Sequence, residues 1–328
     1  MNGAHALLHT LAGADVTVCF ANPGTSEMHF VAAMDDVPEM RSILGLFEGV
    51  VTGAADGYAR MTDRPAATLL HLGPGMANGI ANLHNARRAN VPLVNIVGDH
   101  ATYHKQYDAP LDSDIEAAAR TFSGWVDCPM HAEDVGNSAA AALTAACGPP
   151  PMVATLILPA DVSWNQGASP ATPLPRPAAV SPDDQAIANA AKVLGSSEPC
   201  LLLLGGRALR VAALRHARRI ADATGARLLS ETFPTRVERG AGRPEIDRLL
   251  YDVDAARAQL AGYRHVIASL WPISGEHTAW LANSFYTTLK TTNTDTATAL
   301  HQATRELRDD ILQRAHPHLW APYTHTGP

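Results

Sequence analysis

The sequence has few cysteines and no long apolar run. These two features argue against a disulfide-bonded protein and against a membrane-spanning one. Cysteine occupies only positions 19, 128, 147 and 200, and no two of these form a Cys-x-x-Cys pair. Such spacing is typical of buried thiols in a reducing cytosol. No apolar run approaches the ~20 residues that span a bilayer. No basic segment followed by an apolar one opens the chain, so we expect neither a membrane span nor a secretory signal.

Excess positive charge is also missing. The formal net charge is −7 at pH 7, which argues against a nucleic-acid surface. Hydrophobic residues make up 46% of the 328 positions, enough for two domains that each bury a core. We therefore expect a soluble, cytoplasmic protein that binds neither nucleic acid nor a membrane.

Helical and strand patterns alternate along the first 160 residues. Apolar runs typical of buried strands occupy residues 16–20, 43–46, 67–72, 93–97 and 153–158. Segments with helical patterns lie between them, at residues 3–13, 48–61, 76–89 and 132–146, and a further helix starts near Thr25. Continuous apolar strands between helices predict a doubly wound parallel α/β sheet that is covered on both faces.

A proline-rich stretch divides the chain. Residues 163–182 contain five prolines and few large apolar side chains, which is typical of a linker. We place a first domain at 1–165, the linker at 166–182 and a truncated second α/β domain at 183–262. In that second domain, helices are predicted at 183–195 and 208–224, and strands at 200–204 and 227–230.

Four motifs in the first domain carry its chemistry. Glu48 opens a Gly/Ala-rich helix, and a strand-to-helix turn built from Gly73, Pro74 and Gly75 follows one strand later. Asn22-Pro-Gly-Thr-Ser-Glu27 and Val97-Gly-Asp-His100 complete the set. Together they resemble the pyrimidine-binding domain of thiamine diphosphate (ThDP) enzymes, above all the group of acetolactate synthase large subunits and benzoylformate decarboxylases. The resemblance runs from about residue 1 to residue 262.

The resemblance implies a ThDP-dependent enzyme of the acetolactate synthase or 2-oxo acid decarboxylase type, a transferase or lyase. In this family the cofactor forms an ylid with the help of its own aminopyrimidine, which a glutamate activates by bonding the pyrimidine ring nitrogen. Glu48 matches that glutamate. The side chains expected to surround it are Leu44, Leu46, Phe47, Val50 and Val51. The alternative is a glutamate placed at a helix N-terminus only for the helix dipole.

Further residues are assigned to the site by the same resemblance. Gly73, Pro74, Gly75 and Asn78 would bind the pyrimidine end of the cofactor, the glycines because no Cβ intrudes on a flat ring. The alternative for Gly73–Gly75 is a plain strand-to-helix turn.

Two residues match positions that face the substrate in benzoylformate decarboxylase-like members. Thr25 would hold the carboxylate of a 2-oxo acid, and the imidazole of His71 would assist proton transfer. A hydrogen-bonded core histidine is the alternative for His71. His100 and His104 have the i, i+4 spacing of metal ligands, but without a third ligand we expect a solvated loop and no metal site.

Two departures from the family pattern limit the expected activity. The acetolactate synthase pattern has Phe-Gln in the region where this chain has residues 109–114, which argues against carboligation and leaves decarboxylation or another 2-oxo acid reaction open. The sequence also contains no Gly-Asp-Gly, the motif with which the family binds the cofactor's diphosphate and Mg²⁺ in a further domain. We therefore expect the chain to bind only the pyrimidine end, and to be inactive alone. A homodimer or a separate diphosphate-domain chain would be its partner; FAD binding stays open.

The pattern changes near residue 262. Residues 263–328 resemble the C-terminal portion of a CHAT domain, a caspase-like peptidase module, yet no cysteine follows Cys200 to serve as a nucleophile. We expect this tail to complete the second domain, with the strand Val266–Leu270 joining its sheet. The alternative function is a non-catalytic fusion or interaction protein with a CHAT-like tail.

Overall fold

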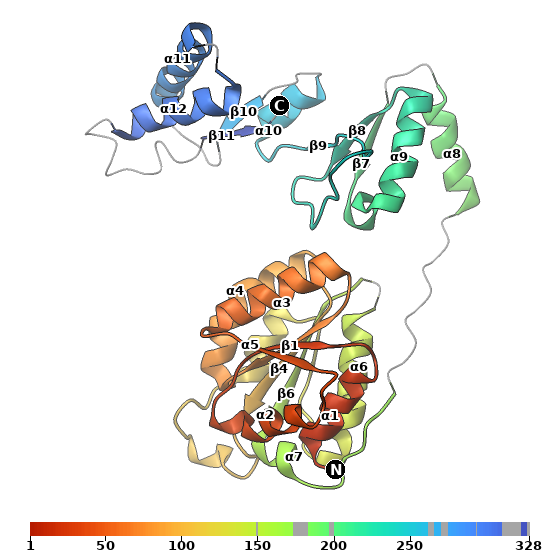
Figure 1. Ribbon diagram of the computed structural model, residues 1–328, viewed down its shortest axis with the longest axis vertical. Helices are drawn as coiled ribbons and strands as arrows, with labels where there is room; N and C mark the ends of the chain where they lie inside the picture. The colour runs from red at the N-terminus through yellow and green to blue at the C-terminus, as the bar shows by residue number, and fades with distance from the viewer. Residues whose placement is uncertain are drawn as a thin grey trace. The chain divides into compact units, whose positions relative to one another are not determined.

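The computed structural model describes residues 1–148, 150–172, 183–196, 200–261, 266–269, 275–292, 294–309 and 323–326. The chain forms two units, Met1–Pro182 and Asp183–Pro328, which Figure 1 colours from red to blue along the chain. The predicted linker at 166–182 falls where the first unit ends, and residues 173–182 of it lie outside the described residues.

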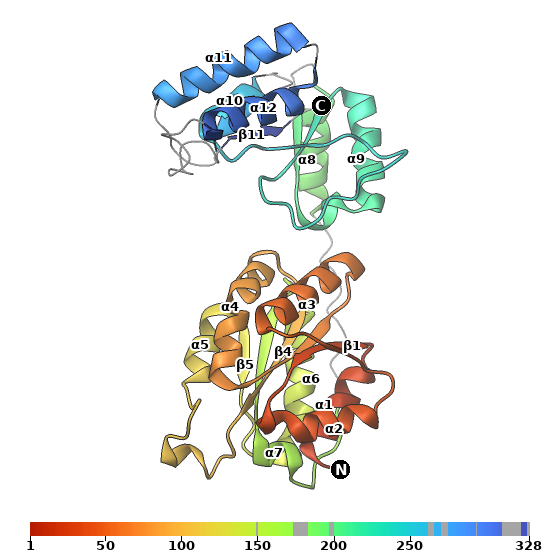
Figure 2. The same cartoon turned by 60° about the vertical axis from the view of Figure 1, so that its left-hand side comes forward.

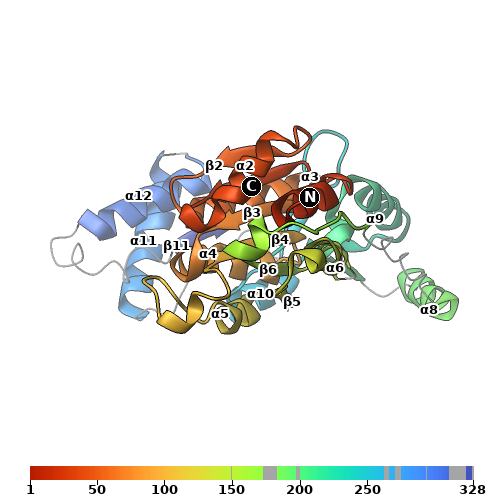
Figure 3. The ribbon, with the colours of Figure 1, turned by 90° about the horizontal axis from the view of Figure 1, so that it is seen from below.

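A six-stranded parallel sheet forms the centre of the first unit. Its strands are β1 (Val18–Asn22), β2 (Arg41–Leu44), β3 (Ala66–Leu70), β4 (Leu93–Asp99), β5 (Trp125–Asp127) and β6 (Val153–Pro159). They are hydrogen-bonded in the order β2-β1-β3-β4-β6-β5, and every pairing is parallel. Figure 3 labels β2, β3, β4, β6 and β5 of this sheet. The predicted doubly wound parallel sheet is confirmed.

Helices cover both faces of this sheet. They are α1 (Gly3–Ala12), α2 (Met28–Asp35), α3 (Glu48–Thr62), α4 (Leu72–Arg88), α5 (Ile115–Phe122), α6 (Val135–Ala146) and α7 (Ala160–Trp164). Figure 2 shows α3, α4 and α5 on one side and α1 and α6 on the other. Leu7, Leu11 and Leu143 belong to one buried cluster, and Val51 and Leu83 belong to a second cluster. The sheet is therefore buried on both faces, as its continuous apolar strands require.

Residues 115–131, to which the apolar pattern assigned no element, contain α5 and β5. The side chain of Asp114 accepts a hydrogen bond from the backbone N–H of Ala117 at 2.9 Å, so Asp114 caps the helix. An acidic residue immediately before a helical stretch is the signal that would have located α5.

The second unit contains a small parallel sheet with the order β7-β8-β9. Its elements are α8 (Asp184–Leu194), β7 (Leu201–Leu204), α9 (Val211–Thr224), β8 (Arg227–Ser230), β9 (Asp247–Arg248) and α10 (Val253–Leu260). Leu209, Leu214, Leu228 and Ile246 form the buried cluster between this sheet and α9. The α/β character predicted for residues 183–262 is present in these elements.

The tail does not extend that sheet. It contains β10 (Val266–Ser269), α11 (Gly275–Thr292), α12 (Thr296–Asp309) and β11 (Tyr323–Thr326). Among the described residues β10 pairs only with β11, in antiparallel register; Leu270 lies outside them. The prediction that Val266–Leu270 joins the central sheet is therefore wrong. An apolar run predicts a strand, but its backbone groups can pair with any neighbouring edge, so the run does not predict the partner.

None of the four cysteines, all of which the structure describes, forms a disulfide with another. Cys19 is buried, and burial raises the pKa of its thiol to about 12. The other three are half-buried, so buried thiols are confirmed for Cys19 alone. In the part of the chain that the structure describes, no helix is both long and apolar enough to cross a membrane.

Candidate active site

The topology of the sheet points to one place for a ligand. The chain passes from β1 outward to β2 and then returns to β3 on the other side of β1. In open α/β sheets, ligands bind at the carboxyl ends of the strands where the strand order reverses in this way. The residues that follow β1 and β3 are Gly24–Glu27 and His71, so two of the predicted motifs meet at this switch point.

Glu48 is the first residue of α3 and is only 8% exposed. Its Oε2 accepts a hydrogen bond from Nδ2 of Asn78 at 3.0 Å. Its Oε1 faces Gly75, where an added Cβ would lie 3.0 Å from that oxygen. No described residue donates a hydrogen bond to Oε1. One carboxylate oxygen is thus hydrogen-bonded to Asn78, and the other has no donor among the described residues.

Helices α3 and α4 pack closely enough for this contact because small residues face each other. The hydroxyl of Thr52 donates to the carbonyl oxygen of Gly79 at 3.1 Å, and Nδ2 of Asn82 donates to the carbonyl oxygen of Gly49 at 2.7 Å. A Cβ at position 79 would lie 2.9 Å from Cγ2 of Thr52. These contacts hold the first turn of α3 against α4, and they therefore fix Glu48 beside Gly75 and Asn78.

The predicted apolar surroundings of Glu48 are wrong for four of the five side chains. Leu44, Leu46, Phe47 and Val50 are 69%, 90%, 49% and 59% exposed, whereas Val51 is 1% exposed. Glu48 is buried by α4 rather than by its neighbours in sequence. Of the four exposed residues only Val50 lies in α3, where two residues at about 100° each turn it away from Glu48. Leu44 ends β2, and Leu46 and Phe47 lie before the helix.

The strand-to-helix turn lies two residues earlier than predicted. Helix α4 begins at Leu72, and Gly73, Pro74 and Gly75 belong to its first turn. Leu72 makes the turn itself, with φ 51° while its side chain is buried. A left-handed leucine is strained, and such strain is concentrated at functional sites. Pro74 fits the first helical turn because its missing N–H has no helical acceptor there.

Gly73 and Gly75 do different things. A Cβ at Gly73 would lie 2.1 Å from Oγ of Ser113, in the loop that follows β4. A Cβ at Gly75 would lie 3.5 Å from Cβ of His71 as well as 3.0 Å from Oε1 of Glu48. Gly75 thus separates the two predicted functional side chains, and Gly73 allows the loop to approach.

His71 is paired with a glutamate to which the sequence motifs gave no role. Nδ1 of His71 lies 2.8 Å from Oε2 of Glu27, and the same oxygen accepts a hydrogen bond from the backbone N–H of Gly24 at 2.7 Å. The Glu27 side chain is 1% exposed and that of His71 is 23% exposed. The signal in the sequence is the spacing Gly24-Thr-Ser-Glu27, in which the fourth residue reaches back to the first as in a capping box.

Thr25 is exposed at the start of the short 3₁₀ turn Thr25–Glu27. Its neighbour Gly24 lies against the imidazole, because a Cβ at position 24 would be 2.4 Å from the ring of His71. The loop after β1 therefore brings Thr25, Glu27 and His71 into one region of the first unit.

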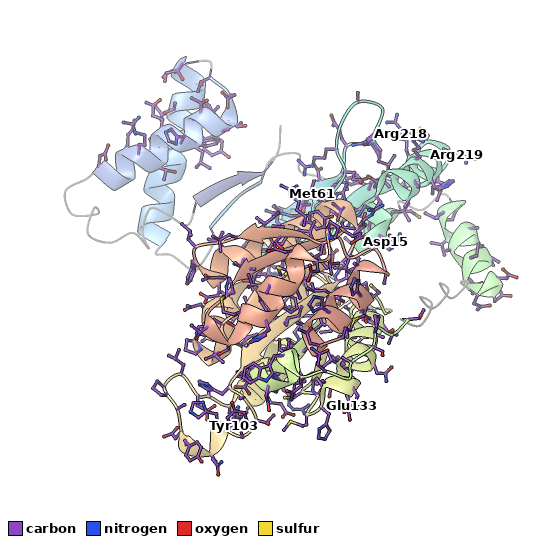
Figure 4. The ribbon with its side chains drawn as sticks, turned by 60° about the horizontal axis from the view of Figure 1, so that its bottom comes forward. Asp15, Met61, Tyr103, Glu133, Arg218 and Arg219 are labelled. Atoms are coloured by element: carbon purple, nitrogen blue, oxygen red, sulfur yellow. The ribbon has the colours of Figure 1, made fainter. Side chains whose placement is uncertain are left out.

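The loop that follows β4 is held at both ends. Nζ of Lys105 lies 2.6 Å from Asp99 and 3.3 Å from Asp112. The backbone N–H of Thr102 donates to Oδ1 of Asp161 at 2.9 Å. Between these contacts the loop is exposed, as Figure 4 shows at Tyr103.

The two loop histidines make a ring contact with each other. The rings of His100 and His104 lie 5.7 Å apart. No described set of three or more His, Cys, Asp or Glu side chains could hold a metal ion.

Burial is the main influence on the pKa of the Glu27 carboxyl. Loss of solvent raises the pKa of its carboxyl, and the hydrogen bond from Gly24 together with the nearby imidazole of His71 opposes this only in part. A carboxyl with a raised pKa stabilises the fold fully below its ordinary pKa of 4.5, and that stability is lost as the pH rises through the folded-state pKa.

We therefore expect the stability of the wild type relative to Glu27→Gln to fall as the pH rises above 4.5, because only the wild type must then bury a charge. The fall amounts to about 1.4 kcal/mol for each unit by which the folded-state pKa exceeds the ordinary one. Urea unfolding at several pH values from about 4 to about 8 measures the difference. A pH-independent difference would contradict the raised pKa.

Comparisons with known proteins find relatives for both ends of the chain. Residues 1–119 match the family model of the N-terminal TPP binding domain of thiamine pyrophosphate enzymes, and residues 240–328 match the CHAT domain. One relative is IlvX of Mycobacterium tuberculosis strain H37Rv, whose name describes it as an acetolactate synthase large subunit. It is 61% identical to this chain over 267 residues. That match covers 81% of this chain and 51% of IlvX.

Benzoylformate decarboxylase of Pseudomonas aeruginosa is 36% identical over 155 residues, covering 47% of this chain and 29% of that protein. Among solved structures, one described as a thiamin diphosphate-dependent enzyme of Mycobacterium smegmatis has a TM-score of 0.71 at 26% identity. The match covers 80% of this chain and 51% of the chain in that structure. The 4-hydroxybenzoylformate decarboxylase of Rhodococcus jostii RHA1 has a TM-score of 0.64 at 26% identity and matches 71% and 45% of the two chains. This chain spans about half the length of IlvX.

Proposed function

Because residues 1–119 carry the N-terminal TPP binding domain of thiamine pyrophosphate enzymes, we propose that the chain takes part in a ThDP-dependent reaction on a 2-oxo acid, of the acetolactate synthase or decarboxylase type. The observation that carries this proposal is the setting of Glu48. The side chain is 8% exposed, Asn78 holds one of its oxygens at 3.0 Å, and the other oxygen faces a glycine.

The residues present fit the pyrimidine end of the cofactor. Oε1 of Glu48 has no donor among the described residues, and Gly75 contributes no Cβ in front of it. A carboxyl oxygen beside a bare backbone suits a flat heterocycle with a ring nitrogen to bind. When bound, ThDP supplies an electron sink for the negative charge that forms as a 2-oxo acid loses its carboxylate.

The neighbouring side chains would act on the substrate. The exposed hydroxyl of Thr25 would donate a hydrogen bond to the carboxylate of the 2-oxo acid. The ring of His71 is partly exposed, with its Nδ1 turned to Glu27, so its Nε2 would carry a proton to or from the substrate. Gly75 lies between His71 and Glu48, so both would serve one bound molecule.

The diphosphate end needs a second contributor. Residues 1–328 contain no Gly-Asp-Gly, so Mg²⁺ and the diphosphate would be bound by residues other than these, for example in a second subunit or a separate diphosphate-domain protein. A cofactor held only at its pyrimidine end loses the electrostatic anchoring that a metal provides. The chain alone would therefore bind ThDP weakly and turn over no substrate.

Calorimetric titration of the chain with ThDP tests the proposal. We expect weak binding that Mg²⁺ does not strengthen, that thiamine without its diphosphate reproduces, and that Glu48→Gln reduces about tenfold or more through loss of a charge-assisted hydrogen bond. The matched control Glu39→Gln changes an exposed glutamate and should leave binding unchanged. Binding that depends on Mg²⁺, or that is equal in the two variants, would contradict the assignment of Glu48.

The CHAT match favours a second candidate function, that of a non-catalytic fusion or interaction protein. The match covers residues 240–328, and no cysteine lies in that range, so the tail has no thiol nucleophile. Phe285, Ala299, Leu300 and Ala303 form a small buried cluster in its described part, which suits a packing role. Failure of ThDP and thiamine to bind, together with cooperative unfolding of the tail, would favour this candidate.

A further inference from the structure

The two carboxyl oxygens of Glu27 have different surroundings. Oε2 has two partners, the backbone N–H of Gly24 at 2.7 Å and Nδ1 of His71 at 2.8 Å. Oε1 is buried and has no hydrogen-bond partner among the described residues. It lies against β4, since a Cβ at Gly98 would be only 1.7 Å from it. An unpartnered buried carboxyl oxygen is costly, so its presence needs a reason.

The hydrogen bonds of Oε2 determine which ring nitrogen of His71 carries a proton. Oε2 accepts the N–H of Gly24, and when it carries no proton of its own it can only accept, so Nδ1 of His71 then approaches it as a donor. The ring then carries its first proton on Nδ1, and Nε2 is left as the nitrogen that exchanges a proton. Among the described residues no side chain or backbone group forms a hydrogen bond with Nε2, so this nitrogen can exchange a proton with a bound molecule.

We propose that Glu27 is a positioning residue that fixes the Nδ1–H tautomer of His71, so that the pair exchanges a single proton with a bound substrate through Nε2. The proton exchange with a substrate rests on the proposed function. The tautomer of His71 does not depend on the cofactor.

The second proton of the pair has two places to reside. One is Nε2 of His71, which gives a protonated ring beside a carboxylate; the other is Oε1 of Glu27, which gives two neutral groups. Both states have the same number of protons, and both keep Nδ1–H on Oε2. Release from Nε2 to a substrate leaves a neutral ring bonded to the Glu27 carboxylate. The unpartnered oxygen is thus the alternative proton site of the pair.

The other ionisable groups around this pair have contacts of their own. Glu48 of α3 is bonded to Asn78, and Asp99, the neighbour of Gly98 on β4, is paired with Lys105. On α2, His29 stacks on Trp164 at a ring distance of 5.1 Å. The nearby charge that acts on the pKa of Glu27 is the imidazole of His71, so the two side chains govern the proton of the pair together.

Nitrogen chemical shifts of the histidine rings, measured by NMR on the full chain without cofactor, test the tautomer directly. The chain has 15 histidines, so the His71 signal is identified by its loss in His71→Gln. At a pH where the ring carries one proton, we expect a protonated Nδ1 and a bare Nε2 in the wild type. Glu27→Gln retains an acceptor and should preserve this tautomer, whereas Glu27→Leu should yield a mixture.

Two controls separate this result from other effects. Glu48→Gln should leave the His71 tautomer unchanged, so a failed cofactor assignment does not affect the measurement. Glu39→Leu, at an exposed position, should leave it unchanged as well. A bare Nδ1 in the wild type would overturn the proposal, and so would identical His71 signals in the wild type and a folded Glu27→Leu. If Glu27→Leu does not fold, the wild-type and Glu27→Gln spectra still decide.

Discussion

Glu48→Gln is expected to slow proton exchange at the reactive carbon of bound ThDP by about 10²–10⁴-fold, the range that a positioned acid–base group contributes. Glutamine has the shape of glutamate, and its side-chain oxygen can still accept the hydrogen bond from Asn78. It cannot, however, hold or share a proton with a pyrimidine nitrogen. The substitution therefore removes the acid and retains the packing between α3 and α4.

The measurement is hydrogen–deuterium exchange of the cofactor's reactive carbon, followed by NMR. It uses the chain mixed with a subunit that carries the Gly-Asp-Gly motif, in the presence of Mg²⁺. Glu39→Gln serves as the matched control, and the unfolding transition of both variants should coincide with that of the wild type. Equal exchange rates in Glu48→Gln and the control would show that Glu48 does not activate the cofactor.

The sheet of the first unit could be predicted from the sequence because its strands are short apolar runs bounded by helices with their own period. The predicted strand at 93–97 is β4 (Leu93–Asp99), and the one at 67–72 is β3 (Ala66–Leu70), with Leu72 as the first residue of α4. Such runs must be buried on both faces, and a parallel sheet is the arrangement that achieves this. Boundaries were less accurate, as at α4, which begins at Leu72 and not at residue 76, because helix ends depend on single residues.

The site could be predicted only where one residue is enough to define a role. Glu48 and Gly75 could be singled out because a carboxylate at a helix start and a glycine in a turn are visible in a motif. The fold brings them together, since a Cβ added at Gly75 would lie 3.0 Å from Oε1 of Glu48. Glu27 was missed because its role comes from a contact across 44 residues, to His71. The exposure of Leu46 was missed for the same reason, since burial depends on which distant helix packs where.

Gly98→Ala is expected to destabilise the first unit by about 1–3 kcal/mol, because it overpacks a filled interior. The new Cβ would lie 1.7 Å from Oε1 and 2.5 Å from Cδ of Glu27, so either the carboxyl or β4 must move. Glu27→Ala alone should also destabilise, by about 1–3 kcal/mol, since the N–H of Gly24 loses its acceptor. Hydrogen exchange of the β4 amides reports both effects on this unit.

The two substitutions together should cost less than the sum of their separate effects. Glu27→Ala vacates the space that the methyl group introduced at position 98 would need, so a double-mutant cycle should give a favourable coupling of about 0.5–3 kcal/mol. Gly57→Ala is the matched control, because a Cβ at that position in α3 meets nothing within 4 Å. It should be neutral or stabilise the helix by up to about 1 kcal/mol. Additive effects at positions 27 and 98 would mean that Oε1 does not lie against Gly98, and that the buried pair is arranged differently.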